Sequence, residues 1–143
     1  MGANLIKKRF EVIDHTADIG LKAYGDSLGE LFENFAYGIF SQIADLDNVE
    51  ERDSFEIILE AEDQEELLVD WLNELLYISD ARKTILKKFE ISEITETQLR
   101  AMVFGEKIDH QRHRIYTYIK AATYYDLKIE HDGIWQGQVI FDV

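Results

Sequence analysis

The sequence predicts an α+β domain with a mainly antiparallel sheet and two helices packed on one face of that sheet. Two observations lead to this prediction. The expected elements follow in the order strands, helix, strand, helix, strands, and each helical segment is apolar along one side only. The chain has 143 residues, the usual size of one domain, so we expect a single domain over residues 1–143.

Strands are predicted where apolar and polar residues alternate along the chain. The first two strands are expected over 10–13 and 19–24, and the third over 54–61. After the second helix, the pattern predicts one strand after another. These later strands form two hairpins, which pair 86–94 with 98–104 and 115–129 with 134–141.

Two helices are predicted from start signals followed by a periodic apolar face. Ser27 and Glu30 have the spacing of a capping box, in which the serine accepts from the first turn and the glutamate reaches back. Asp63 with Glu66 opens the second helix. After each of these capping residues, apolar residues recur at spacings of three and four, which gives the helix one apolar face to pack against a core. They are Leu28, Leu31, Phe32, Phe35, Ala36, Ile39, Phe40 and Ile43 in the first helix, and Leu68, Trp71, Leu72, Leu75 and Leu76 in the second.

The loop length of the last hairpin decides its register. A two-residue loop at 132–133 would mix core and surface positions on each face. A three-residue loop with Gly133 in the left-handed conformation pairs Ile129 with Trp135 and keeps one face apolar. We therefore expect the second register.

This register also predicts the neighbours of the residue before the C-terminus. It sets Asp142 opposite Ala122, with Lys120 and Tyr124 as diagonal neighbours within reach of long side chains. The Asp142 carboxylate is expected on the face away from Phe141. We therefore expect a cation beside this carboxylate.

The composition excludes several classes of function. Fifteen basic against 29 acidic residues give a net charge of −14, which opposes nucleic-acid binding because such binding relies on Lys and Arg. The absence of cysteine excludes disulfides, thiolate metal sites and cysteine nucleophiles. No apolar run approaches the ~18 residues of a membrane span, and the N-terminus lacks the pattern of a secretory signal. We therefore expect a cytoplasmic protein with no membrane partner and no direct sequence-specific contact to nucleic acid.

The densest polar group in the N-terminal strands is Asp-His-Thr-Ala-Asp at 14–18. Its aspartates and histidine can hold a divalent ion, whereas the same aspartates can also act as turn formers that cap their own backbone. At the other end of the chain, Asp142 precedes Val143, whose free carboxylate would add a second anion. Hard oxygen donors of this kind suit Ca²⁺ or Mg²⁺.

Four short segments spread over the chain form a specific set. They are Asp-His-Thr-Ala-Asp-Ile-Gly at 14–20, Gly-Asp at 25–26, Ile-Lys-Ala-Ala-Thr-Tyr at 119–124 and Val-Ile-Phe-Asp-Val at 139–143. Each piece is weak by itself, but as a set they resemble the archease family, and the similarity runs essentially from end to end. Tyr125 departs from the family pattern, which favours His there, and this departure affects no candidate ligand.

The resemblance implies an archease-like fold and a metal-binding accessory protein that activates an RtcB-type RNA ligase in tRNA splicing. Such a protein promotes guanylylation of the ligase and its multiple turnover. By the family's motif, metal binding falls to Asp14, Asp142 and Val143. Asp18 belongs to the same motif and is a further candidate ligand. Because Ca²⁺ tolerates irregular sets of oxygen ligands, we expect Ca²⁺ as the bound ion, with Mg²⁺ or Mn²⁺ as alternatives.

Two more residues match positions that matter for activation of the ligase. They are Asp26 and Lys120, and we expect both to border the bound ion. An accessory protein of this kind needs no catalytic residues of its own. Its negative charge would suit a ligase surface that is basic for RNA binding.

Two other functions are compatible with the residues. A metal-dependent phosphoester hydrolase would use the same carboxylates with His15 as base, but the chain has no Gly-rich phosphate loop and no His-Glu-x-x-His or Gly-x-Ser-x-Gly motif. A chaperone-like interaction module would use its acidic surface and aromatics such as Tyr116, Tyr118 and Tyr124. The histidines and arginines of 110–114 are interpreted as a solvated loop.

Overall fold

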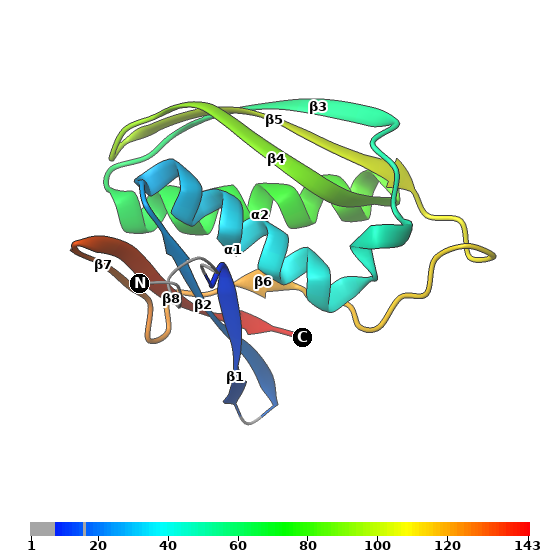
Figure 1. Ribbon diagram of the computed structural model, residues 1–143, viewed down its shortest axis with the longest axis horizontal. Helices are drawn as coiled ribbons and strands as arrows, with labels where there is room; N and C mark the ends of the chain where they lie inside the picture. The colour runs from blue at the N-terminus through cyan, green and yellow to red at the C-terminus, as the bar shows by residue number, and fades with distance from the viewer. Residues whose placement is uncertain (1–7, 16) are drawn as a thin grey trace, which may run out of the picture.

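Within the part of the chain that the computed structural model describes, residues 8–15 and 17–143, two β-sheets enclose a layer of two α-helices (Figure 1). The side chains of Asp14 and His15 lie outside this description. Every strand pair described is antiparallel, and the helices contact both sheets. The predicted α+β class with a mainly antiparallel arrangement is confirmed. The strands divide into two sheets, and each sheet carries the helices on one face.

The larger sheet is built from the two ends of the chain. β2 (Asp18–Gly25) lies between β1 (Phe10–His15) and β8 (Ile134–Asp142). The far side of β8 pairs with both β6 (Ala121–Ala122) and β7 (Lys128–Asp132). The N-terminal and C-terminal strands described here thus share one sheet, with only β2 between them.

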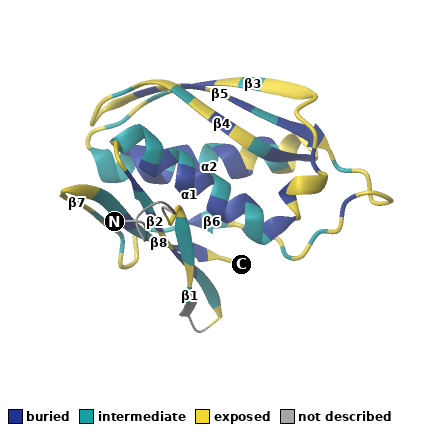
Figure 2. Cartoon of the chain, viewed as in Figure 1, coloured by how far each residue is buried: buried dark blue, intermediate teal, exposed yellow. Residues whose placement is uncertain are grey.

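The smaller sheet consists of β3 (Asp53–Glu60), β5 (Gln98–Lys107) and β4 (Thr84–Ile94), with β5 in the middle. The predicted hairpin of 86–94 with 98–104 is confirmed, and it continues for a few residues at its open end. One face of this sheet lies on the helices, and much of the other is open to solvent (Figure 2).

The first helix, α1 (Leu28–Ile43), begins where the capping box predicted it. The Ser27 hydroxyl accepts from the Glu30 amide at 3.1 Å, and the Glu30 carboxylate accepts from the Asp26 amide at 2.7 Å. A short 3₁₀ helix, η2 (Leu46–Asn48), follows α1. The predicted apolar face of α1 is confirmed. Six residues of this face have no exposed area: Leu31, Phe32, Phe35, Ala36, Ile39 and Phe40.

The second helix, α2 (Gln64–Arg82), is capped by Asp63, whose carboxylate accepts from an amide of the first turn at 2.8 Å. It ends at Lys83, which adopts the left-handed conformation (φ 51°) that commonly terminates helices. Trp71 joins the two helices, because its indole N–H donates to the carbonyl of Phe32 at 3.0 Å. Both aromatic side chains are fully buried, so this bond lies in the centre of the core.

The core lies in the helical layer and reaches the inner face of both sheets (Figure 2). Burial of each large apolar side chain stabilises the fold by about 1.5–3 kcal/mol. The bulkiest fully buried side chains come from both helices and from β8: Trp71, Phe32, Phe35, Phe40 and Phe141.

The prediction of one long strand over 115–129 is wrong. In this range, only the short β6 and the start of β7 pair with β8. Ala122 pairs with Phe141, and Lys128 pairs with Gln138. The chain therefore advances six residues where β8 advances only three, so the excess residues must leave the sheet. They do so as a turn in which Asp126 adopts the left-handed conformation (φ 51°) and accepts from the Gln138 side chain at 3.0 Å.

The predicted pairing of Ile129 with Trp135 is wrong for the same reason. The structure pairs His131 with Trp135, two residues further along β7. The prediction assumed one unbroken strand, whose single register had to keep every apolar residue on one face. Because the turn divides the strand, β6 and β7 each take their own register. The left-handed conformation predicted for Gly133 is confirmed (φ 76°).

Candidate functional site

Three of the residues predicted to bind metal lie where the strands of the larger sheet end together. In this sheet Asp14 pairs with Ile19, and Ile19 pairs in turn with Phe141. Asp18 directly precedes Ile19 in β2. Asp142 directly follows Phe141 in β8. The topology therefore brings these three aspartate positions to one end of the β1–β2–β8 ladder, although they come from opposite ends of the chain (Figure 1).

A tight turn joins β1 to β2 beside these aspartates. His15 pairs with Asp18 to close the hairpin, and Ala17 adopts the left-handed conformation at φ 66°. For a residue with a Cβ, this conformation costs roughly 1–2 kcal/mol, so the paired strands must hold the turn in place. The side chains of Asp14 and His15 lie outside the described residues, and their roles as ligand and as base stay predictions.

Lys120 lies beside the end of β8. Its backbone N–H donates to the carbonyl of Asp142 at 2.8 Å, and both side chains are exposed. The structure thus brings these two residues together. The predicted partner of Asp142 is wrong by one residue, because β6 pairs it with Ala121 and not with Ala122. The shift follows from the separate register of β6.

Asn73 on α2 holds the short strand that follows Lys120. Its side-chain oxygen accepts from the Ala122 N–H at 2.7 Å, and its NH₂ group donates to the Ala122 carbonyl at 3.4 Å. Thr123 adds a second anchor, because its N–H and its hydroxyl both donate to the Ile140 carbonyl, at 3.0 and 2.8 Å. Sequence reasoning missed Asn73, since a polar residue on a helix does not reveal which strand it will meet.

Replacing Asn73 with Ala will lower the free energy of unfolding by about 2 kcal/mol, because the N–H of Ala122 loses its acceptor. Chemical denaturation followed by circular dichroism measures this change. Glu74→Ala, the next position on α2, serves as the matched control and should stay within about 0.5 kcal/mol of the wild type. Equal stability of the two variants would contradict the anchoring role of Asn73.

Asp26 does not lie at this end of the sheet. It follows Gly25, whose partner Trp135 is at the opposite end of the β2–β8 ladder from Phe141. Across the eight residues of β2, at roughly 3.3 Å per residue, Asp26 is roughly 25 Å from Asp18. The expectation that Asp26 borders the aspartate cluster is therefore wrong, because β2 runs fully extended between them. Its part in ligase activation stays a prediction.

Asp26 instead lines a polar hollow at the start of α1. The hollow has a volume of 410 Å³ and is also lined by Arg9, Glu33 and Asn34. Arg9 donates to the side-chain oxygen of Asn34 at 2.8 Å, and the Asn34 NH₂ group donates to the Tyr24 carbonyl at 2.7 Å. Burial raises the pKa of Glu33, whose carboxylate also accepts a backbone N–H of β4 at 2.9 Å. A partner that contacts Asp26 would meet this hollow.

An ion-pair network around the buried carboxylate of Glu106 holds the loop that follows β5. The Glu106 side chain is almost fully buried, and its carboxylate accepts from Arg112 at 2.8 Å and from Arg52 at 3.1 Å. The Glu50 amide and the His113 ring each lie 3.0 Å from the same carboxylate. The bond from Arg112 is the main cause that lowers the pKa of Glu106 to about 2.

The interpretation of 110–114 as a solvated loop is wrong for His113, which is buried. Its Nδ1 lies 3.0 Å from the backbone N–H of Asp109, and since an N–H can only donate, Nδ1 is the acceptor. The proton of the neutral ring is therefore on Nε2, between the Asn48 carbonyl at 3.1 Å and the Glu106 carboxylate. These bonds give His113 a structural role in this loop.

The described side chains by themselves do not complete a metal site. Among them, no group of three His, Asp or Glu side chains lies close enough to hold an ion. Asp18 and Asp142 offer the hard oxygen atoms that Ca²⁺ and Mg²⁺ prefer. The donor chemistry of these two side chains therefore fits a divalent cation, and the ligand roles of Asp14 and Val143 stay predictions.

Almost the whole chain is similar to one family of known proteins. Residues 10–143 match the Archease protein family. This chain belongs to the archease family. The protein archease of Pyrococcus abyssi is 43% identical over 141 residues, which cover 95% of this chain and 99% of that protein. The protein archease of Methanosarcina mazei is 40% identical over 141 residues, which cover 95% and 97%.

Solved structures share the archease fold. The solution structure of protein 1598 from Methanobacterium thermoautotrophicum is 36% identical, has a TM-score of 0.80 and covers 96% of this chain and 100% of that one. The crystal structure of an archease, possible chaperone, from Thermotoga maritima has a TM-score of 0.65 at 24% identity and covers 93% and 96%. The predicted archease-like fold is thus confirmed. None of the described helices is both long and apolar enough to cross a membrane.

Proposed function

We propose that this archease is a metal-binding accessory protein that activates an RtcB-type tRNA-splicing RNA ligase, by promoting its guanylylation and multiple turnover. One observation carries the proposal: strand pairing gathers the positions of Asp14, Asp18 and Asp142 at one end of a sheet, beside Lys120. A carboxylate cluster next to a cation suits the handling of metal ions and phosphates better than it suits stability alone. Membership of the archease family supports the same function.

A divalent cation would be held by Asp14, Asp142 and the carboxylate of Val143, with Asp18 as a further candidate ligand. Ca²⁺ is the expected ion, because it accepts irregular sets of carboxylate oxygens, and Mg²⁺ or Mn²⁺ are the alternatives. When bound, the ion would supply positive charge on an otherwise acidic surface.

Two further residues have roles in the proposed activation of the ligase. Lys120 adds a positive charge beside the carboxylates, and the bond from its backbone N–H to the Asp142 carbonyl holds the residue at the end of β8. Asp26 would meet the ligase at a separate point, since β2 places it at the other end of the sheet. The net charge of −14 would steer the protein toward a basic, RNA-binding ligase surface.

Asp142→Ala will abolish most of the activation in a reconstituted ligase turnover assay. We expect a loss of about tenfold or more, because even the outer partners of metal ligands contribute 10–100-fold. The same variant should lose Ca²⁺ binding in isothermal calorimetry. Asp26→Ala should reduce activation and leave Ca²⁺ binding unchanged, since roughly 25 Å of strand separate it from the cluster.

The control for this experiment is Glu96→Ala, an exposed carboxylate in the turn between β4 and β5 of the other sheet. It should activate the ligase and bind Ca²⁺ as the wild type does. Full activation by Asp142→Ala would contradict the proposed metal site.

A second candidate function is a chaperone-like interaction module. It is favoured by the exposure of three tyrosines, since 54% of Tyr116, 72% of Tyr118 and 58% of Tyr124 face solvent. The related Thermotoga maritima protein is itself described as a possible chaperone. In this case Asp142→Ala would leave partner binding intact. The hydrolase alternative gains no support from the described residues, because the side chain of its candidate base, His15, lies outside them.

A further inference from the structure

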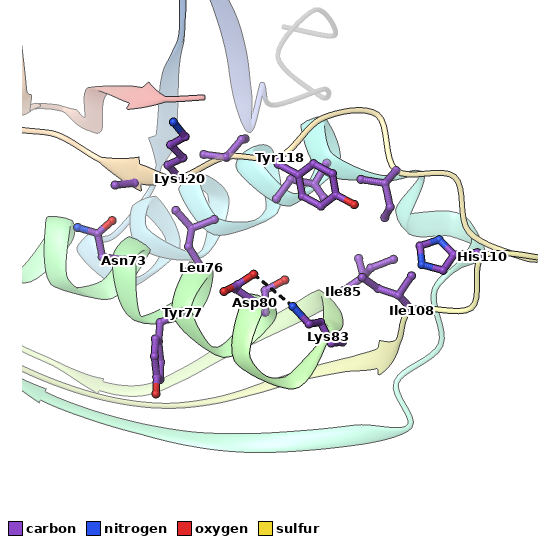
Figure 3. Close-up of a pocket in the computed structure, with 15 residues that line it drawn as sticks. Asn73, Leu76, Tyr77, Asp80, Lys83, Ile85, Ile108, His110, Tyr118 and Lys120 are labelled. Atoms are coloured by element: carbon purple, nitrogen blue, oxygen red, sulfur yellow. Dashed lines mark ion pairs between the residues drawn. The ribbon is translucent and has the colours of Figure 1, made fainter.

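An open apolar groove runs along the second half of α2, close to Lys120 (Figure 3). Its volume is 880 Å³, which is within the range of binding pockets. One wall is α2 from Asn73 to Lys83, and the other is the chain from Ile108 to Ala121. Its lining is mainly aliphatic: Ile43, Leu76, Ile85, Ile108, Ile115 and Ile119.

Exposed tyrosines border this groove on both walls. Tyr77 on α2 is 66% exposed, and Tyr118 on the opposite wall is 72% exposed. Tyr118 projects from the chain between the loop and β6 over the groove (Figure 3). Large aromatic side chains held in solvent beside an aliphatic groove are typical of protein-binding surfaces, where Tyr is enriched among the residues that contribute most.

Positive charges mark both ends of the groove in a protein that is acidic as a whole. Lys120 lies at one end, and Lys83 lies toward the other (Figure 3). Residues 107–120 hold four basic side chains and one acidic one, against 15 basic and 29 acidic in the whole chain. The lining has one acidic residue among the described side chains, Asp80, which pairs with Lys83 at 3.6 Å.

The Asp80–Lys83 pair does not neutralise this end of the groove permanently. Both side chains are largely exposed, and an exposed pair of this kind contributes only about 0.2–1 kcal/mol. Lys83 can therefore exchange Asp80 for a carboxylate of another molecule at little cost. The groove thus offers an aliphatic floor with one available cation, Lys83.

We propose that this groove binds an amphipathic, acidic helix of a partner protein. From Asn73 to Lys83, α2 rises by about 15 Å, which is the length of about three turns of a helix laid beside it. Apolar side chains spaced by three and four residues would enter between Leu76 and Ile115. A carboxylate at one end of the bound helix would pair with Lys83. This inference does not depend on bound metal.

The test uses a lactam-bridged helical peptide of about 14 residues, with Leu or Phe at i, i+3, i+4 and i+7 and Glu at most other positions. Fluorescence anisotropy measures its binding to the full chain. Tyr118→Ser and Lys83→Glu should each weaken binding about tenfold. The matched controls Tyr125→Ser and Lys128→Glu change exposed residues that do not line the groove, and they should bind as the wild type does.

Three results would overturn the proposal. The first is equal or tighter binding of the same peptide with Lys in place of Glu. The second is unchanged binding by both Tyr118→Ser and Lys83→Glu, with circular dichroism confirming that the variants are folded. The third is a concentration-dependent dimer in sedimentation that Tyr118→Ser abolishes, which would show that a second copy covers the groove. Asp142→Ala should bind the acidic peptide normally, so failure of the metal proposal and failure of this one are distinguishable.

Discussion

Glu106→Gln will lower the free energy of unfolding by about 3 kcal/mol at neutral pH. The carboxylate is 4% exposed and accepts from Arg112, Arg52 and the Glu50 amide. Glutamine keeps the shape of the side chain but removes the negative charge and turns an NH₂ group toward these donors. The two guanidinium groups then keep only the exposed Glu50 carboxylate, and the His113 ring keeps only the Asn48 carbonyl as its acceptor.

The same substitution changes how stability depends on pH. Hydrogen bonds, first from Arg112, lower the pKa of Glu106 from 4.5 to about 2. A carboxylate with a lowered pKa stabilises the fold above its unfolded value and loses that effect as the pH falls through its folded value. The contribution of Glu106 is therefore complete above about pH 4.5 and is lost as the pH falls toward 2.

Urea denaturation at a series of pH values checks this prediction. The difference in unfolding free energy between wild type and Glu106→Gln should be constant above pH 5 and should shrink steadily below pH 4.5. Glu96→Gln, at an exposed turn position, is the control and should differ little from the wild type at neutral pH. A difference for Glu106→Gln that stays unchanged down to pH 2 would contradict the network described for its carboxylate.

The network also connects stability with the groove. Glu106 and His113 hold the loop whose residues Ile108 and Ile115 line one wall. The buried Glu106 carboxylate, which lies outside the predicted metal site, thus maintains the shape of the groove. We expect Glu106→Gln to weaken binding of the acidic peptide as well, although the residue does not line the groove.

The helices could be predicted in detail because their signals are local. Ser27 accepts from the Glu30 amide as the capping box predicts, Glu30 reaches back to the amide of Asp26, and Asp63 caps the second helix. Most strands were located for the same reason, but the long strand over 115–129 was wrong and the division into two sheets was not predicted. Alternation shows which side chains face inward, and it does not show which strand lies next to which. The turn at Asp126 was missed because no Gly or Pro marks it.

The candidate site was predicted only in part, because some of its contacts join segments that lie far apart in the chain. The approach of Lys120 to Asp142 followed from strand pairing near the end of the chain, and an error of one residue in register did not separate them. Asp26 was misplaced because eight residues are a short distance in sequence and a long one in an extended strand. Asn73 and Glu106 act through contacts with segments far along the chain, which a single sequence does not reveal.

Gly105→Ala will destabilise the protein by about 3 kcal/mol or more. Gly105 pairs with Leu86 in the smaller sheet, where a Cβ would lie only 2.9 Å from the Leu86 Cα and closer still to the carbonyl oxygen of Ile85. Both obstacles are backbone atoms of β4. No side-chain rotation can relieve the overlap, and β4 would have to shift against β5.

Gly29→Ala is the matched change with the opposite expected sign. A Cβ at Gly29 would meet only ordinary contacts, the nearest at 3.5 Å from Ile94, and the position lies in the first turn of α1. Alanine should therefore stabilise the helix by about 0.5–1 kcal/mol. Thermal and chemical denaturation of both variants measure the two effects side by side. A Gly105→Ala variant as stable as the wild type would mean that β4 and β5 do not approach as closely as described, since the cost arises from that approach alone.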